Sequence, residues 1–197
     1  SFHGRTLATI TATGQPKYQQ HFEPLMPGFA YVPYNDIKAI EVAITDLDEG
    51  NRRVAAIMLE PLQGEGGVRP GDVAYFQRLR EICDQNDILL VFDEVQSGVG
   101  RTGKLWGYEN LGVEPDIFTS AKGLAGGIPI GAMICKKFCD VFEPGNHAST
   151  FGGNPLVTAA ALTVLQTLET DHILENVQAR GEQLRGHLKA LATKYSP

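Results

Sequence analysis

Three charged residues each follow a short apolar run that is bounded by turn residues. Glu60 follows residues 54–59, Asp93 follows residues 88–92, and Lys122 lies just beyond residues 116–119. The first two runs flank an amphipathic helical stretch, which is the pattern of a βαβ unit with parallel strands. Ligands of parallel sheets bind beyond the carboxyl ends of the strands, so we expect these three side chains to share one crevice.

Asp93 and Lys122 allow two interpretations. As an isolated pair, a carboxylate and an ammonium group at adjacent strand ends form a buried or half-buried ion pair. Alternatively, they are the pair that pyridoxal phosphate needs: the lysine forms a Schiff base with the aldehyde, and the aspartate keeps the pyridine nitrogen protonated, so that the ring accepts electrons. The lysine, once released by a substrate amine, then moves the α-proton. The residue types alone leave both interpretations open.

One stretch of the sequence imitates two nucleotide-binding motifs. Asp93 and Glu94 end an apolar strand as in a Walker B element, and residues 98–104 approximate a phosphate loop. However, Leu105 stands where the magnesium-binding hydroxyl belongs, and the loop follows the acidic strand instead of preceding it. The glycine spacing also suits a dinucleotide fingerprint, but no strand directly precedes it and no helix start follows. A P-loop ATPase fragment is the rival from a different class.

The composition excludes several other classes of protein. The chain has 197 residues, 43% of them hydrophobic, with a formal net charge of −6, so nothing favours nucleic acid or an anionic membrane as a partner. No apolar run is long enough to span a membrane. Cys135, Cys139 and His147 lack the paired spacings of structural zinc sites, so we expect no metal. Three cysteines cannot all pair with one another, which favours a reducing cytoplasm.

The remaining pattern predicts an α/β fold with a mostly parallel sheet flanked by helices. A fourth strand is expected at residues 130–135, after those at 54–59, 88–92 and 116–119. Helices are expected from Asn35 or Asp36 to Gly50, over about sixteen residues from Asp72, from Asn154 through Leu168, and from Asp171 to near the end of the sequence. A polar joint at residues 169–171 is the expected boundary between segments 1–169 and 170–197.

Five sequence motifs, in this order, resemble those of the class III aminotransferases of pyridoxal-phosphate fold type I. They are SFHGRT at 1–6, EPLQGEGGV at 60–68, FDEVQSGVGRTG at 92–103, AKGLAGGIPIGA at 121–132 and STFGGNP at 149–155. The resemblance implies that residues 1–169 are the central part of the large, cofactor-binding domain. It also implies that residues 170–197 begin the small C-terminal domain.

The resemblance implies cofactor roles for five residues. Lys122 is the position of the Schiff-base lysine and proton shuttle, and Asp93 is that of the partner of the ring nitrogen. Gln96 matches the residue that hydrogen-bonds the ring hydroxyl, and Phe2 matches the aromatic residue that stacks on the ring. Thr150 matches a threonine that reaches the cofactor phosphate of the neighbouring subunit, so the resemblance implies a homodimer.

The resemblance also implies which residues line the substrate-binding side of the site. Arg5 matches the arginine that receives a substrate carboxylate, a task suited to a bidentate guanidinium group. Glu65 matches a glutamate that gates an arginine across the pocket, so that one site accepts both an ω-amino substrate and glutamate. Glu60, at a strand end nearby, is expected to support it. His3 is expected to act behind the residues that contact the cofactor, without being catalytic.

Two further motifs, ATGQPKY at 12–18 and VPYND at 32–36, make the chain most similar to one branch of the family. That branch passes the δ-amino group of N-acetylornithine to 2-oxoglutarate in arginine biosynthesis. A branch acting on ornithine or another ω-amino acid is the alternative. The family's main phosphate loop lies upstream of SFHGRT and its substrate arginine lies in the C-terminal domain. We therefore expect the 197 residues by themselves to bind the cofactor weakly or not at all and to be inactive.

Overall fold

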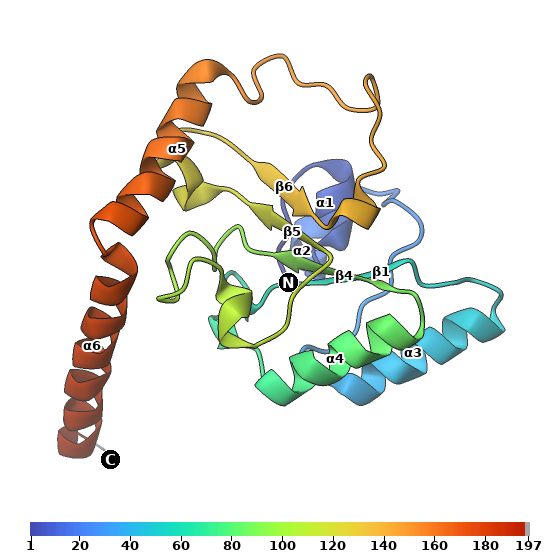
Figure 1. The fold of residues 1–197 in the computed structure, drawn as a ribbon. Coiled ribbons are helices and arrows are strands. Elements are labelled where there is room, and N and C mark those ends of the chain that lie inside the picture. Colours follow the sequence, from blue (N-terminus) through green and yellow to red (C-terminus); the bar gives the residue numbers. More distant parts are fainter. Residues whose placement is uncertain (196–197) are drawn as a thin grey trace.

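A four-stranded sheet forms the centre of the computed structural model, which describes residues 1–195 (Figure 1). Ser196 and Pro197, at the end of the predicted 170–197 segment, lie outside the described residues. The strands in spatial order are β1 (Ala56–Leu59), β4 (Leu89–Asp93), β5 (Ile117–Ser120) and β6 (Ala132–Cys135). Each bound lies within two residues of the predicted run. The predicted α/β fold with a mostly parallel sheet is confirmed.

The strand register places three strand ends at one edge of the sheet. β1 and β4 are parallel, with Leu59 opposite Phe92, and β4 and β5 are parallel, with Asp93 opposite Thr119. β6 runs antiparallel to β5, so it begins at the edge where β5 ends. The residues that follow β1, β4 and β5 therefore come together, as the parallel connections require.

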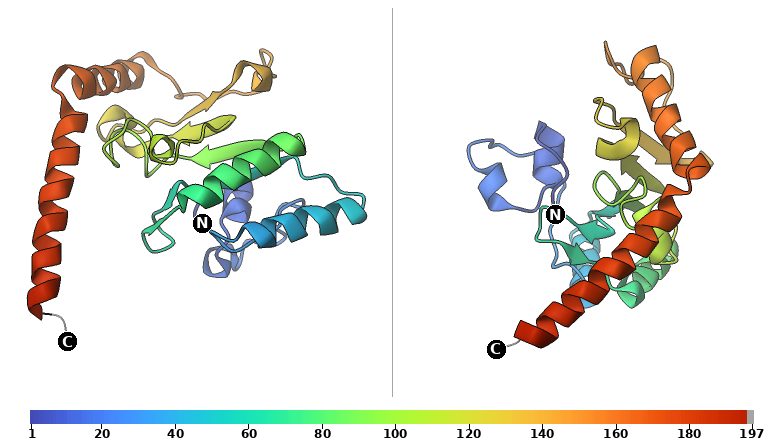
Figure 2. Two further views of the ribbon diagram at one scale, coloured as in Figure 1. Left: turned by 60° about the horizontal axis from the view of Figure 1, so that its bottom comes forward. Right: turned by 90° about the vertical axis from the view of Figure 1, so that its left-hand side faces the viewer.

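Two helices cover one face of this sheet (Figures 1 and 2). α3 (Ile37–Glu49) and α4 (Val73–Gln85) begin at the predicted N-caps. The Asp36 carboxylate accepts a hydrogen bond from the Ala39 N–H, and Asp72 accepts from the N–H groups of the first turn of α4. These bonds satisfy donors that a helix start otherwise leaves free. α4 lies between β1 and β4 in the sequence, so the predicted βαβ unit is confirmed.

The core lies between these helices and the sheet. Phe76 and Leu79 of α4 pack with Leu90 and Phe92 of β4, and all four side chains are fully buried. The Phe76 and Phe92 rings meet edge to face, with centroids 5.3 Å apart. Such packing fixes β4 in place. It therefore also fixes Asp93, the residue that follows Phe92 and ends the strand.

Two further helices complete the described chain. α5 (Pro155–Thr170) begins at the predicted N-cap Asn154, whose side chain accepts hydrogen bonds from two N–H groups of the first turn. α6 (Ile173–Tyr195) extends away from the sheet (Figure 2). Its predicted apolar stripe is largely exposed, including Leu184, Leu188 and Leu191. The break between α5 and α6 lies at the predicted joint, whereas the division into two domains stays a prediction.

Several short elements were not expected from the sequence. They are α1 (Leu7–Ala12), α2 (Pro16–Gln19), the antiparallel pair β2 (Leu62–Gln63) and β3 (Arg69–Pro70), and the 3-10 helices η1 (Gly107–Asn110), η2 (Lys122–Ala125) and η3 (Lys137–Cys139). Each is too short for an apolar periodicity to develop. Among the helices of residues 1–195, none has the length and apolar content that crossing a bilayer requires.

Candidate active site

The predicted charged residues lie at the C-terminal edge of the sheet. Glu60 comes directly after β1, Asp93 is the last residue of β4, and Lys122 comes two residues after β5. Parallel pairing of β1 with β4 and of β4 with β5 brings these three strand ends to the same edge. The sheet thus gathers the residues in the arrangement expected from the apolar runs.

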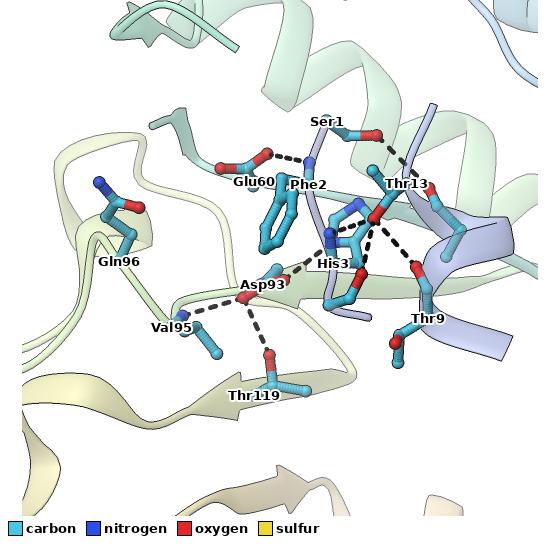
Figure 3. Close-up of polar contacts among 12 residues, drawn as sticks. Ser1, Phe2, His3, Thr9, Thr13, Glu60, Asp93, Val95, Gln96 and Thr119 are labelled. Carbon is cyan, nitrogen blue, oxygen red and sulfur yellow. Dashed lines mark hydrogen bonds and ion pairs between the residues drawn. The ribbon is translucent and has the colours of Figure 1, made fainter. Parts of the chain in front are cut away.

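Asp93 is a buried carboxylate that is held from three directions (Figure 3). Its Oδ2 lies 2.8 Å from His3 Nδ1. Its Oδ1 accepts hydrogen bonds from the Val95 N–H at 2.9 Å and from the Thr119 hydroxyl at 3.2 Å. Burial by itself raises the pKa of Asp93, but the hydrogen bonds from His3, Val95 and Thr119 outweigh it, so the pKa lies below its ordinary value. The carboxyl group is therefore ionised at neutral pH.

Lys122 is exposed and directed at Gln96. Its Nζ donates a hydrogen bond of 2.7 Å to Gln96 Oε1. Its backbone φ of 42° lies in the left-handed region, which residues with a Cβ seldom adopt. Lys122 begins η2, in which Leu124 and Ala125 are buried beside Ala161 of α5. The packing of η2 on α5 thus holds the lysine in an unfavourable backbone conformation at the end of β5.

Gln96 is positioned in turn by the backbone of Gly64. A Cβ placed on Gly64 would lie 2.5 Å from Gln96 Cδ and 2.6 Å from both terminal atoms of the amide. The amide therefore packs directly on the Gly64 backbone, an approach that only glycine permits. Gly64 comes directly after β2, so the β2–β3 hairpin forms the support behind the partner of Lys122.

Replacing Gly64 with alanine is expected to move Gln96 away from Lys122. The new methyl group would occupy the space of the Gln96 amide, and this exposed side chain can swing into solvent. We expect turnover by the native, full-length protein to fall by up to about 100-fold, since displacements of about 1 Å at a site have effects of this size. The free energy of unfolding should change by less than about 1 kcal/mol. Steady-state kinetics and a denaturant titration measure the two quantities.

Gly66→Ala is the matched control for this change. Gly66 lies in the same loop, but its added Cβ would approach Gln63 instead of Gln96, with Gln63 Oε1 3.0 Å away. We expect near-normal turnover from this variant. Equal losses of turnover in the two variants would show that general damage to the loop, and not displacement of Gln96, is responsible.

Phe2 and Arg5 lie together at the beginning of the described chain. The Phe2 ring meets the Tyr18 ring edge to face, with centroids 5.5 Å apart. The guanidinium carbon of Arg5 lies 4.2 Å from the Tyr18 ring centroid and 5.4 Å from that of Phe2. These cation–π contacts orient an arginine that is otherwise exposed. In Figure 3 the Phe2 backbone is bonded to Glu60 and the Phe2 ring points toward Asp93.

Glu60 contacts the main chain on both sides of the site. Its side chain is buried, Oε1 accepts a hydrogen bond from the Phe2 N–H at 3.0 Å, and Oε2 accepts one from the Gly64 N–H at 3.0 Å. The Tyr34 hydroxyl donates to the carbonyl oxygen of Glu60 at 2.9 Å. Glu60 therefore connects the segment that carries Phe2 with the hairpin that carries Glu65.

The structure does not bring every candidate residue into contact with the others. Glu65 is exposed in the turn between β2 and β3, and Thr150 lies in the exposed stretch that precedes α5. Within residues 1–195, neither side chain forms a hydrogen bond to another candidate residue. Their predicted roles, toward a substrate and toward a neighbouring subunit, stay predictions.

One residue at Asp93 was not expected from the sequence. Thr119 has no motif of its own, and only the register of β4 and β5 places its hydroxyl at Asp93. His3, for which we expect a role behind the residues that contact the cofactor, has a side chain that is 1% exposed and lies against the Asp93 carboxylate.

Glu94, the glutamate of the Walker-like motif, faces the interior. Its side chain is fully buried and accepts hydrogen bonds from the Ser97 hydroxyl and from the N–H groups of Gly107 and Tyr108. Burial raises the pKa of this carboxyl group, against the effect of those hydrogen bonds. A residue enclosed in this way closes the loop after β4 and has no access to a water molecule or a nucleotide. The geometry therefore disfavours the ATPase interpretation.

Comparison with known proteins decides the family. The family model described as aminotransferase class III matches residues 1–197. The chain belongs to the class III aminotransferase family. The resemblance inferred from the five sequence motifs is thereby confirmed.

Relatives of this class III chain are similar over nearly its whole length. A protein from Synechocystis named acetylornithine aminotransferase is 80% identical over 195 residues, which are 99% of this chain and 46% of that protein. A protein of the same name from Nostoc is 75% identical over 195 residues, again 99% of this chain and 46% of that protein. The chain thus spans about half the length of the curated relatives it matches.

Solved structures show the same fold for this class III chain. The ornithine aminotransferase of Toxoplasma gondii aligns with a TM-score of 0.89 at 35% identity, covering 98% of this chain and 45% of that one. The acetylornithine aminotransferase of Elizabethkingia anophelis aligns with a TM-score of 0.77 at 36% identity, covering 86% of this chain and 44% of that one. The fold and the family therefore agree.

Proposed function

We propose that this chain is the central part of a pyridoxal-phosphate-dependent aminotransferase in which Lys122 is the catalytic lysine. The observation that carries the proposal is the pair of neighbouring strand ends, with an exposed lysine after one and a buried, ionised aspartate at the other. An ordinary ion pair does not explain this geometry, because Asp93 bonds His3 and Lys122 bonds Gln96. Each charged group thus has its own partner.

The donor set fits pyridoxal phosphate. The Lys122 amine is exposed and can condense with an aldehyde, and the Asp93 carboxylate, kept ionised by its hydrogen bonds, suits a protonated ring nitrogen. When bound, the cofactor supplies a carbonyl group for amines and an aromatic ring that accepts the electrons of a substrate C–H bond. A second solved structure of the Toxoplasma gondii ornithine aminotransferase has this cofactor at partial occupancy in the active site of that protein.

Each residue of the site has a defined task in this proposal. When the cofactor is bound, the Lys122 Nζ would hold it through its aldehyde, and once freed by a substrate amine this Nζ would be the base that moves the proton of the substrate carbon. Asp93 stabilises positive charge on the ring nitrogen, and His3 orients Asp93. Gln96, whose amide oxygen accepts the hydrogen bond from Lys122, would donate a hydrogen bond from its amide N–H to the ring hydroxyl. Phe2 packs on the face of the ring.

We propose N-acetylornithine as the amino donor and 2-oxoglutarate as the acceptor. The support is the name of relatives that are up to 80% identical to this chain. Arg5 is proposed to bind a substrate carboxylate, and Glu65 to act on the other side of the pocket. Ornithine is the second candidate donor, because the likeness to the Toxoplasma gondii enzyme covers nearly the whole of this chain. The reaction would belong to arginine biosynthesis.

We further propose a homodimer in which Thr150 contacts the cofactor phosphate of the neighbouring subunit. Its support is the match of STFGGNP to the family pattern and the exposure of Thr150. We also propose that the protein works in a reducing compartment, the cytoplasm. The thiols of Cys83, Cys135 and Cys139, which are free in the described residues, are compatible with that environment.

A comparison of two amino donors tests the substrate assignment. The native, full-length protein with pyridoxal phosphate and 2-oxoglutarate should give kcat/KM at least about tenfold higher for N-acetylornithine than for ornithine. In a pocket that binds the acetyl amide, ornithine leaves one or more of the polar contacts unmade. Each missing contact lowers kcat/KM by a factor of about ten. Glutamate formation measures both rates. Equal or better use of ornithine would contradict the assignment and leave the aminotransferase proposal intact.

A further inference from the structure

The Glu60 carboxylate has an arrangement that its predicted substrate role does not explain. It is 4% exposed, and each of its two oxygens accepts a backbone hydrogen bond from a different segment. A buried carboxylate is costly unless such donors satisfy it. Both donors here belong to segments that carry candidate residues of the site. The Tyr34 hydroxyl, bonded to the carbonyl oxygens of Glu60 and Pro61, further restrains the position of the glutamate backbone.

One oxygen of Glu60 fixes the segment of Phe2 and His3. The Phe2 N–H donates to Glu60 Oε1, and the next N–H along the chain, that of His3, donates to Thr13 Oγ1 at 2.8 Å (Figure 3). Two consecutive peptide groups are therefore held from two sides. Their side chains are oriented accordingly: the Phe2 ring points toward Asp93 in Figure 3, and His3 Nδ1 reaches Asp93 Oδ2.

The other oxygen of Glu60 fixes the support of Gln96. The Gly64 N–H donates to Glu60 Oε2, and the Gln96 amide packs directly on the Gly64 backbone. Gln96 in turn accepts the hydrogen bond from Lys122 Nζ. A shift of Gly64 would therefore reach the catalytic lysine through only one intervening side chain.

We propose that Glu60 is a positioning residue that sets the aromatic face of the site through Phe2 and the partner of Lys122 through Gly64. We propose this role in place of direct contact with the substrate, because Glu60 is 4% exposed and each of its oxygens accepts a backbone hydrogen bond. The catalytic part of the proposal rests on the function proposed above for Lys122 and Asp93. The positioning part rests on contacts within this chain, so the two can be tested separately.

The test compares Glu60→Gln with Ile44→Ala in the native, full-length protein. Glutamine keeps the shape of glutamate but has a single acceptor oxygen, and its NH2 group faces the second N–H. We expect amide hydrogen exchange, measured without pyridoxal phosphate, to become about tenfold faster in residues 1–6 or in residues 61–66. With pyridoxal phosphate, we expect kcat to fall by about 10- to 100-fold while the KM for the amino donor changes by less than about threefold.

Ile44→Ala separates positioning from loss of stability. Ile44 of α3 is buried near Val54 and Ile88, which precede β1 and β4 at the sheet edge opposite the site, so its truncation destabilises the fold away from the site. We expect it to leave kcat per folded molecule near normal. Unchanged exchange in both segments of Glu60→Gln, or a fall in kcat no larger than that in Ile44→Ala, would overturn the proposal. Failure of the unsubstituted protein to bind pyridoxal phosphate would instead overturn the proposed function.

Discussion

Replacing Lys122 with alanine is expected to abolish turnover and the visible absorption that appears when pyridoxal phosphate joins the lysine. Alanine has neither the amine that condenses with the cofactor nor the base that moves the proton, so the loss should be at least about 10³-fold. The variant should still fold. Lys122 is exposed and alanine keeps its Cβ, so the free energy of unfolding should change by no more than about 0.5 kcal/mol. An absorption spectrum and a single-turnover assay on the native, full-length protein measure the outcome.

Two companion variants sharpen this test. Lys122→Arg keeps the positive charge and hydrogen-bond donors toward Gln96, yet a guanidinium group is not deprotonated in proteins and does not condense with the aldehyde. We expect it to be as inactive as Lys122→Ala. Lys104→Ala removes an exposed lysine from the loop after β4 and should behave as the unsubstituted protein. Retention of the visible band and of turnover in Lys122→Ala would refute the proposed mechanism.

The location of Lys122 and Asp93 at one sheet edge was predictable from local sequence. Apolar runs of strand length, an N-cap at Asp72 and a helix between two runs are enough to predict parallel strands whose ends meet. The predicted strands differ from β1, β4, β5 and β6 by at most two residues at either end, because turn residues bound each run clearly. The apolar runs do not indicate in which direction the outermost strand of the sheet runs. The antiparallel β6 has the same apolar character as its parallel neighbours.

The partners of these residues were less predictable because they depend on contacts between distant segments. His3 and Asp93 are 90 positions apart in sequence, and the Thr119 hydroxyl reaches Asp93 only through strand register. The contact of Gly64 with Gln96 requires a two-residue strand, β2, which is too short to leave a pattern. Roles for Gln96 and Phe2 at the cofactor are predicted only through the family resemblance.

Asp93→Asn is the second substitution with a large expected effect. Asparagine has nearly the same shape but no charge, so it cannot stabilise a protonated ring nitrogen, and we expect turnover to fall by about 10²–10³-fold. Asparagine also has a single acceptor oxygen where Asp93 uses two, so either His3 or the Val95 and Thr119 donors lose their acceptor. A buried donor left without a partner costs about 1–3 kcal/mol of unfolding free energy. Cofactor titration, kinetics and denaturant unfolding at several pH values separate these effects.

The pH dependence of that stability difference has a definite sign. In the folded protein the pKa of Asp93 lies below its ordinary value of 3.8, so its ionised form stabilises the fold at higher pH. The contribution is fully present above the pKa of the unfolded chain and is lost as pH falls through the lower pKa of the folded state. The difference between the unsubstituted protein and Asp93→Asn should therefore be constant near neutral pH. It should shrink below about pH 4.

Asp116→Asn is the matched control, because Asp116 is also buried and its pKa is also lowered. Burial raises that pKa, but the Leu90 N–H, Arg80 and Lys136 outweigh it. Asp116 directly precedes β5 and so lies at the opposite edge of the sheet from Lys122. Both asparagine variants should lose stability with the same acid dependence, while only Asp93→Asn should lose cofactor affinity and turnover per folded molecule. Equal turnover in the two variants would mean that Asp93 stabilises the fold and that another group faces the ring nitrogen.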